Sequence, residues 1–406
     1  MSDLIKSRRS AALERSSKPK AGFLVLADDL TGALEAGAKF AAQGVRALVM
    51  MRHKLKGLEA RHVPTVLVID TETRHVSAGA ARRTIRKLAS AAPSLGFNRI
   101  YKKTDSTLRG NIASEFEGLM SAWPGSSVLY VPTYPRMGRT VSGGVLRVAG
   151  VPVACTAFGV DNLNPVAESH IPTLLGKTRR MRVVSVKPET LVVPDEPGVC
   201  VCDGESAADV RKVARFFASS SAFALAAGPA AFLHQLARLD SPPHGNGGSL
   251  PPVRSALIVS GSRHPASLAQ LQQAEQRGIQ ALESAAVPSR PSTWFILKSS
   301  SSTRGSKFAR QQAKDVLNIL RRAPFDALIV FGGDTASTIL RALGDPHLRP
   351  VGEVMEGVPL ATISRERLAA AVPARNRQLV WVSKAGGFGL PGAILSMRRI
   401  LRRRQS

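Results

Sequence analysis

Short runs of apolar residues alternate along this chain with longer segments of helical periodicity. The runs lie at residues 23–27, 47–50, 66–70, 99–103, 127–132, 256–260, 325–331 and 378–383. Apolar, β-branched runs of about four to eight residues without polar alternation are typical of strands that are buried on both faces. Helical segments between such strands indicate βαβ units. The pattern therefore predicts an α/β fold of mostly parallel sheets with flanking helices.

A segment rich in proline and glycine divides the chain into two parts. The sequence LDSPPHGNGGSLPPVRS, residues 239–255, is typical of a linker. A chain of 406 residues is also too long for one hydrophobic core. We therefore predict two domains with the active site in the cleft between them. The predicted parts are a disordered basic extension at 1–21, an N-terminal domain at 22–240, a linker at 241–254 and a C-terminal domain at 255–406.

The formal charge of the chain is +27, from 56 basic and 29 acidic residues. A basic surplus of this size favours anionic partners, such as phosphorylated small molecules, nucleic acid or a membrane surface. Proteins that bind nucleic acid tend to interleave aromatic residues with the charge, and Phe, Tyr and Trp make up 5% of this sequence. A basic surface that is simply exposed to solvent explains the charge no less well than a nucleic-acid role does.

Other features of the sequence exclude several classes of protein. No apolar run reaches the length of about 18 residues that a membrane span needs. Residues 1–21 contain six Lys or Arg and no apolar central region, so they do not form a secretory signal. Three cysteines are too few for a disulfide framework. We therefore expect a cytoplasmic protein without a membrane partner.

Three segments of the C-terminal part share one plan of strand, loop rich in glycine or serine, and helix. They are ALIVSGSRHPASLAQL (256–271), LIVFGGDTASTILRAL (328–343) and LVWVSKAGGFGLPGAI (379–394). Such loops lie at the carboxyl ends of parallel strands. There, glycine lets backbone N–H groups approach a phosphate, and the next helix presents its positive end. The plan therefore predicts a nucleotide or phosphate site, although the chain has no P-loop motif.

We assign this predicted phosphate site to the second and third loops. Gly332, Gly333, Asp334 and Thr335 would surround the phosphates, with Asp334 or Thr335 also capping the helix. The third loop would contribute a cation and two more glycines: Lys384, Gly386 and Gly387.

The N-terminal part has the densest group of polar residues, at four predicted strand ends. The segments are ADDLTG (27–32), IDTETRH (69–75), YKKTDSTLRGN (101–111) and VPTYPRMGRT (131–140). Cations in these segments could hold a carboxylate or a phosphate with paired hydrogen bonds. An aspartate there could accept the proton of a hydroxyl, as phosphoryl transfer to an alcohol requires.

Simpler interpretations of these residues are also open. Asp29 could cap the helix that follows it, which would leave Asp28 without a purpose. Lys102 and Lys103 alternate along one strand, so one of them is expected to face solvent.

Taken together, these segments resemble the four-carbon acid sugar kinase family. The resemblance rests on ADDLTGA, KKTDSTLRGN, PTYPRMGRTV, PVACTAFGVDNLNPV, VSGS, GGDTA, EGVPL and SKAGGFG, in that order, and covers roughly residues 22 to 396. It implies a two-domain α/β kinase that phosphorylates erythronate, threonate or a 3-oxo-tetronate with ATP. The N-terminal domain would bind the acid and the C-terminal domain the nucleotide.

The resemblance also suggests roles for single residues. Asp28 would orient or deprotonate the attacking hydroxyl, with Asp105 as the second candidate. The substrate carboxylate would pair with Arg109, Lys103 or Arg74. Further candidates at the sugar acid are Asp29, Ser106 and Arg139. Around ATP and its Mg²⁺, the candidates are Ser260, Ser262, Gly332, Gly333, Asp334, Thr335, Lys384, Gly386 and Gly387. No metal ligand is assigned.

Three alternatives remain at this stage, and one is that departures from the family pattern in the loops around ATP have left an inactive homologue. The chain could be a kinase for a different small hydroxy acid, because loop shape decides specificity and the sequence does not fix it. It could also be a non-catalytic protein that binds nucleic acid or another polyanion through its +27 charge. The sequence favours small-molecule partners over nucleic acid and leaves a homo-oligomer open.

Overall fold

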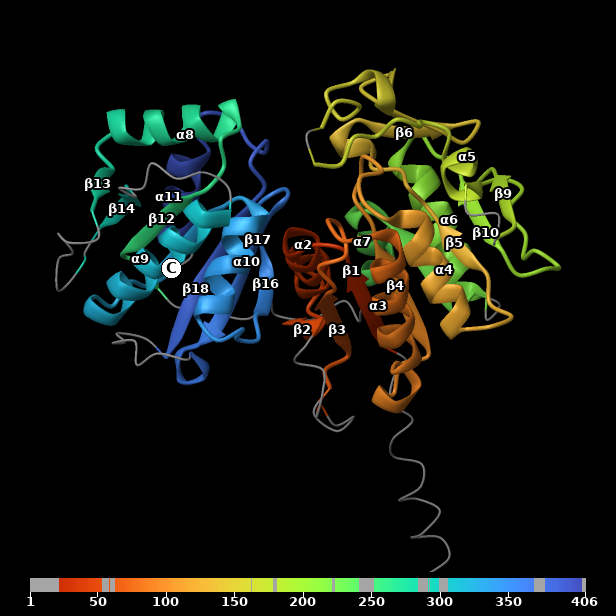
Figure 1. Cartoon of the computed structure of the whole chain (residues 1–406), viewed down its shortest axis with the longest axis horizontal. Coiled ribbons are helices and arrows are strands. Elements are labelled where there is room, and N and C mark those ends of the chain that lie inside the picture. The colour runs from red at the N-terminus through yellow and green to blue at the C-terminus, as the bar shows by residue number, and fades with distance from the viewer. Residues whose placement is uncertain are drawn as a thin grey trace, which may run out of the picture.

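The computed structural model of the chain describes residues 22–52, 58, 63–161, 163–177, 181–220, 223–240, 252–283, 291, 293–298, 306–368 and 377–403. The predicted basic extension and residues 241–251 of the predicted linker lie outside the described residues. The described chain forms two large sheets with flanking helices, in two lobes, and a small third sheet (Figure 1). This confirms the predicted α/β class.

The N-terminal sheet has eight strands, and every pair of neighbours is parallel. In spatial order the strands are β2 (Ala47–Met51), β3 (Val66–Asp70), β1 (Phe23–Ala27), β4 (Arg99–Lys103), β11 (Leu225–Gly228), β5 (Val128–Tyr130), β10 (Val199–Cys202) and β9 (Val183–Val186). The central strands are buried on both faces, which is why they appear in the sequence as unbroken apolar runs.

The C-terminal sheet has seven strands and is mixed. In spatial order they are β13 (Gln280–Leu282), β14 (Trp294–Leu297), β12 (Ala256–Ser260), β15 (Ala327–Phe331), β18 (Gln378–Lys384), β17 (Val358–Ser364) and β16 (Arg349–Met355). The first five strands are parallel, and β17 and β16 form an antiparallel edge. The carboxyl ends of β12, β15 and β18 therefore lie side by side, as the shared strand-loop-helix plan requires.

Helices flank both sheets. They are α2 (Leu30–Ala41), α3 (Ala78–Ser90), α4 (Ile112–Ala122), α5 (Ile171–Gly176), α6 (Ala207–Ser219), α7 (Ala230–Asp240), α8 (Pro265–Gln276), α9 (Ser306–Arg322), α10 (Gly333–Ala342) and α11 (Ala393–Arg403). Within the described residues, none of these helices has both the length and the hydropathy needed to cross a membrane.

A small antiparallel sheet, which the sequence pattern did not predict, lies at one end of the N-terminal lobe (Figure 1). It consists of β6 (Arg139–Ser142), β7 (Val145–Val148) and β8 (Val151–Pro152). Its strands are short and partly exposed, so they lack the apolar runs that reveal the larger sheets.

Helix α2 lies at the boundary between the two lobes (Figure 1). It packs on β1, β2 and β3 of its own sheet and on β16 and β17 of the other sheet. Ten of its twelve residues are buried. At its C-terminal end Lys39 Nζ lies 2.8 Å from Glu353 Oε2 on β16. The helix that begins at the two adjacent aspartates is thus held by both domains.

We expect Lys39→Met to destabilise the protein by about 3 kcal/mol, because it removes one partner of a mostly buried ion pair and leaves the other charge in place. The two side chains are 9% and 17% exposed. Urea unfolding would measure the loss, and the double variant Lys39→Met, Glu353→Met should recover part of it. A change below about 0.5 kcal/mol in the single variant would show that the pair does not hold the domains together.

Candidate active site

The carboxyl ends of β1, β3 and β4 bring the predicted acids and cations together. Ala27 at the end of β1 is in register with Asp70 on one side and Lys103 on the other. The N–H groups of Thr73 and Arg74 donate to the carbonyl of Asp28, at 3.1 and 3.2 Å. These bonds fix the loop after β3 beside the residue that follows β1.

Arg74 joins the two adjacent aspartates. Its Nε donates to Asp28 Oδ2 at 2.7 Å, and its Nη1 donates to Asp29 Oδ2. Its Nη2 lies 3.7 Å from Asp105 Oδ2. The Arg74 side chain is 11% exposed and that of Asp28 is 2% exposed. Carboxylates this deeply buried need a partner, and one guanidinium serves three of them.

The carboxyl group of Asp28 is only partly hydrogen-bonded within the described chain. Burial raises the pKa of its carboxyl, but the charges of Arg74, Lys102 and Lys103 outweigh burial, so the pKa lies below its ordinary value. Asp28 Oδ1 is buried and has no hydrogen-bond partner among the described residues. An ionised carboxylate with such an atom at a cleft can accept a hydrogen bond from a hydroxyl.

Asp29 has a different role in the structure. Its Oδ1 accepts a hydrogen bond from the N–H of Gly32 at 2.7 Å, so it caps α2, as the simpler interpretation predicted. Burial raises the pKa of Asp29, and the nearby charge of Asp28 adds to this, while Arg74 opposes it.

Asp105 binds its own loop. Its Oδ1 accepts from Thr107 N at 2.8 Å and from Arg109 Nε at 3.2 Å, and its Oδ2 accepts from Arg109 Nη2 at 2.8 Å. Burial raises the pKa of Asp105, but Arg109 and Arg74 hold it well below the ordinary value. Both oxygens are engaged, so Asp105 orients Arg109, which lines the cleft. Ser106 is half-buried and lines neither of the two cavities described below.

The prediction that one of the two lysines faces solvent was wrong. Lys102 is fully buried and its Nζ lies 3.1 Å from Glu115 Oε2. Lys103 is 4% exposed, and its Nζ lies 3.5 Å from Glu35 Oε2 on α2 and donates to the carbonyl of Thr104. Both lysines neutralise acids beneath the site, and Lys103 does not line the cleft.

Arg139 begins the first strand of the small sheet and lines neither of the two cavities. Its guanidinium carbon is 5.9 Å from the centre of the Phe158 ring, and that of Arg109 is 5.5 Å from the same ring. Its Nη1 donates to the carbonyl of Met137. The ring of Phe158 thus brings the guanidinium groups of Arg109 and Arg139 close together.

A cleft of about 1180 Å³ lies between these residues and the loops after β12 and β15. From the N-terminal domain, its lining includes Asp28, Asp29, Asp70, Glu72, Arg74 and Arg109. From the C-terminal domain, its lining includes Ser260, Ser262, Gly333, Asp334, Thr335 and Arg341. Candidate residues from both domains therefore face one cavity.

The amino terminus of α10 is open toward this cleft. Gly332, at the N-cap position, has φ +101° and no side chain caps the helix. The prediction that Asp334 or Thr335 caps α10 was therefore wrong, because both lie inside the first turn. A Cβ atom on Gly261 would lie 1.8 Å from Thr335 Oγ1. The loops after β12 and β15 thus meet closely, and the uncapped N–H groups suit a phosphate.

Lys384 turns into its own loop and does not line the cleft. Its Nζ donates to the carbonyls of Ala385, Gly386 and Phe388, at 3.0, 3.3 and 2.9 Å. Burial lowers its pKa to about 8. A Cβ atom on Gly386 would lie 2.2 Å from Ser262 Oγ, so the loop packs on the one after β12. Lys384 shapes the loop that carries Gly386 and Gly387.

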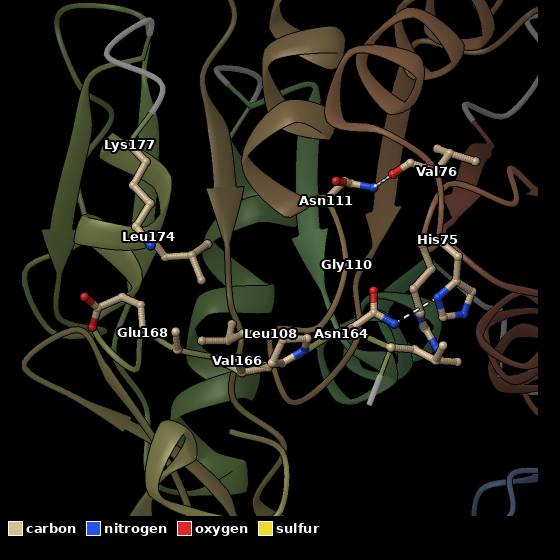
Figure 2. Close-up of a pocket in the computed structure, with 14 residues that line it drawn as sticks. His75, Val76, Leu108, Gly110, Asn111, Asn164, Val166, Glu168, Leu174 and Lys177 are labelled. Atoms are coloured by element: carbon tan, nitrogen blue, oxygen red, sulfur yellow. Dashed lines mark hydrogen bonds between the residues drawn. The ribbon is translucent and has the colours of Figure 1, made fainter. Parts of the chain in front are cut away.

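A second cavity of about 330 Å³ lies beside the cleft and shares four lining residues with it, Arg74, His75, Leu163 and Asn164. Figure 2 shows Leu108 and Val166 in its middle, with Asn164 near His75 at one side. Asn164 Nδ2 and His75 Nδ1 are 2.9 Å apart. The 105–111 loop therefore has two faces, because Arg109 lines the cleft while Leu108 lines the second cavity.

Three residues that line the cleft, Asp70, Glu72 and Arg341, were not among the assigned candidates, and neither was Thr31. Asp70 and Glu72 stand at a predicted strand end beside Arg74, so their position could have suggested them. Thr31 follows Asp29 by two residues. A Cβ atom added to Gly333 would lie 3.4 Å from Oγ1 of Thr31, so the two residues are close neighbours. Arg341 donates a hydrogen bond to Glu72 across the cleft. Its position inside a helical segment of the sequence gave no indication that it would lie at the site.

Two protein-family models match this chain, one in its N-terminal part and one in its C-terminal part. Residues 23–236 match a model described as a sugar-binding N-terminal domain, and residues 295–394 match one described as a nucleotide-binding C-terminal domain. The first match alone covers more than half of the chain.

Two curated relatives and one solved structure are similar over large parts of the chain. A D-threonate kinase of Bordetella bronchiseptica is 29% identical, over 94% of this chain and 98% of its own length. A D-erythronate kinase of Heliobacterium modesticaldum is 27% identical, over 59% of this chain and 57% of its own length. A crystal structure of a Salmonella typhimurium LT2 protein matches with a TM-score of 0.74 and 18% identity, over 93% of this chain and 99% of that chain. This structure shares the fold.

Proposed function

Because this chain belongs to the four-carbon acid sugar kinase family, we propose that it transfers the terminal phosphoryl group of ATP to a hydroxyl of D-threonate. A relative that matches along nearly the whole chain is a D-threonate kinase. The observation that carries the proposal is the cleft itself, which has an unpartnered carboxylate oxygen of Asp28 on one side and the uncapped amino terminus of α10 on the other.

On the acceptor side, Asp28 accepts the hydrogen bond of the attacking hydroxyl and orients its oxygen toward the phosphate. Its low pKa keeps it ionised at neutral pH. Arg109 lines the cleft with a guanidinium that Asp105 holds in place. It pairs with the carboxylate of the sugar acid. Arg74 is already shared among three aspartates, so it positions Asp28.

On the nucleotide side, the first turn of α10 and the loop after β12 hold the phosphates. ATP supplies the phosphoryl group, and Mg²⁺ neutralises the charge of its phosphates. In the described residues no group of three or more His, Cys, Asp or Glu could hold a metal ion alone. Mg²⁺ commonly uses one or two carboxylates together with phosphates. Asp70 fits this need, because it lines the cleft and its Oδ2 is buried without a hydrogen-bond partner among the described residues.

Thr31, in the first turn of α2, has its hydroxyl oxygen close to Gly333, a residue of the other domain that lines the cleft. Its hydroxyl can donate to the phosphoryl group as that group passes between the domains. We expect Thr31→Val to lower kcat about 10- to 100-fold, with little change in either KM, and Thr31→Ser to keep most of the activity. Steady-state kinetics of both variants would test this. A Thr31→Val enzyme with a normal kcat would show that the hydroxyl takes no part.

The proposed function is tested by an ATP-consumption assay with Mg²⁺ and a panel of acids. The panel contains both enantiomers of threonate and erythronate and a 3-oxo-tetronate, and a reaction without acid is the control. Detection of the phosphorylated acid by ³¹P NMR would separate transfer to the acceptor from ATP hydrolysis. D-threonate should give the highest kcat/KM.

Each other outcome has a distinct meaning. A higher kcat/KM for another member of the panel would correct the substrate and keep the reaction class. No phosphorylated acid in any reaction, with ATP binding confirmed, would overturn the proposed acceptors. Steeply salt-dependent binding to nucleic acid in place of any turnover would support the alternative based on the +27 charge.

A further inference from the structure

The lining of the cleft is of mixed chemical character. It includes charged residues of the N-terminal domain and the first turn of α10. Beyond these, the lining contains Leu268 and Leu271 from α8 and Phe308 from α9. Leu268 and Leu271 are three residues apart and so share one face of their helix. We call these three residues the apolar wall.

The side chains of the apolar wall are open to the cleft although they are hydrophobic. Leu268 is 53% exposed, and Leu271 and Phe308 are half-buried. Phe308 is in the first turn of α9, and its ring stacks on no other aromatic ring in the described chain. A partly exposed aromatic ring that lines a cavity can accept a flat partner on its face.

Neither the sugar acid nor the phosphates suit this wall. A four-carbon acid presents hydroxyls and a carboxylate, and a phosphate presents charged oxygens, whereas the three side chains offer neither charge nor a hydrogen bond. The base of a nucleotide is planar and can be buried against leucine and stacked on phenylalanine. Leu268 and Leu271 also lie outside the span that matches the nucleotide-binding model.

We propose that the apolar wall of Leu268, Leu271 and Phe308 binds the base of the nucleotide. This inference rests on the proposed use of a nucleotide as phosphoryl donor. With the base on this wall and the terminal phosphate near Asp28, the nucleotide lies along the length of the cleft. The middle phosphates then lie at the amino terminus of α10.

The test compares a nucleotide with a phosphate chain that has no base. Isothermal titration calorimetry on the full chain would measure the Kd of adenylyl imidodiphosphate and of inorganic tripolyphosphate, both with Mg²⁺. Phe308→Ala should weaken the nucleotide about 10- to 100-fold, as loss of one stacked base does, and leave tripolyphosphate within about twofold. Phe308→Trp should keep nucleotide affinity, because it preserves the ring. The control Leu239→Ala removes a partly exposed leucine on α7, outside both cavities.

The outcomes separate this inference from the proposed function. An unchanged nucleotide Kd in Phe308→Ala would overturn the base site, and so would an equal loss for nucleotide and tripolyphosphate, which would place Phe308 at the phosphates. Either result would leave acid phosphorylation by the wild-type protein untouched. Conversely, the expected pattern in a protein that phosphorylates no acid would support the base site and overturn the proposed reaction.

Discussion

Asp28→Asn is expected to lower kcat about 10²- to 10⁴-fold, the range over which a positioned acid or base contributes to catalysis. Asparagine keeps the size of the side chain and can still accept the hydrogen bond from Arg74, which in the wild type measures 2.7 Å. It loses the charge that attracts the proton of the attacking hydroxyl. The loss should therefore appear in kcat, while the Kd of the nucleotide, which binds mainly on the other domain, stays close to that of the wild type.

Steady-state kinetics and nucleotide titration of the same preparation would measure this effect. Asp195→Asn is a matched control, because Asp195 is exposed and lies outside both cavities. If Asp28→Asn binds both substrates and retains a nearly normal kcat, Asp28 is not the group that orients the hydroxyl. Because Asp105 has both oxygens engaged by its own loop, we expect Asp105→Asn to act through the position of Arg109 and to raise the KM of the acid.

Much of the fold could be predicted from the sequence because buried parallel strands leave a local signature. All eight predicted strand segments are strands, among them 23–27, which is β1. The strand ends then had to meet, because parallel strands place their carboxyl ends at one edge of a sheet. This is why Asp28 and Arg74, 46 residues apart, could both be chosen as candidates from sequence.

The rest depends on contacts between distant segments. Nothing near Lys384 in the sequence shows that its ammonium group turns into its own loop, since this depends on how residues 385–388 are folded. Within the described residues the start of α10 has no side-chain cap because Gly332, which has no side chain, occupies the N-cap position, and the sequence alone did not show at which residue the helix begins. The pair of Lys39 and Glu353 joins residues more than 300 positions apart.

Replacing Arg74 should damage stability and activity together. Arg74 lies within reach of Asp28, Asp29 and Asp105 in a site where its own side chain is 11% exposed. Arg74→Met would leave these buried carboxylates without a shared cation, and we expect it to cost about 3–5 kcal/mol of unfolding free energy. Arg74→Lys keeps the charge but not the planar fork that serves two aspartates at once. It should lose less stability than Arg74→Met and still lower kcat/KM for the acid at least about 10-fold.

A double variant separates the electrostatic role of Arg74 from its shape. If Arg74→Met destabilises by leaving negative charge uncompensated, then Arg74→Met, Asp29→Asn should recover part of the stability, because it removes one of the charges. Activity should stay low, since Asp28 is no longer held. Urea unfolding of the three variants would measure this, with Arg83→Met on the exposed side of α3 as the control. If the double variant is no more stable than Arg74→Met, lost packing explains the damage, and the three aspartates do not depend on Arg74 for their charge balance.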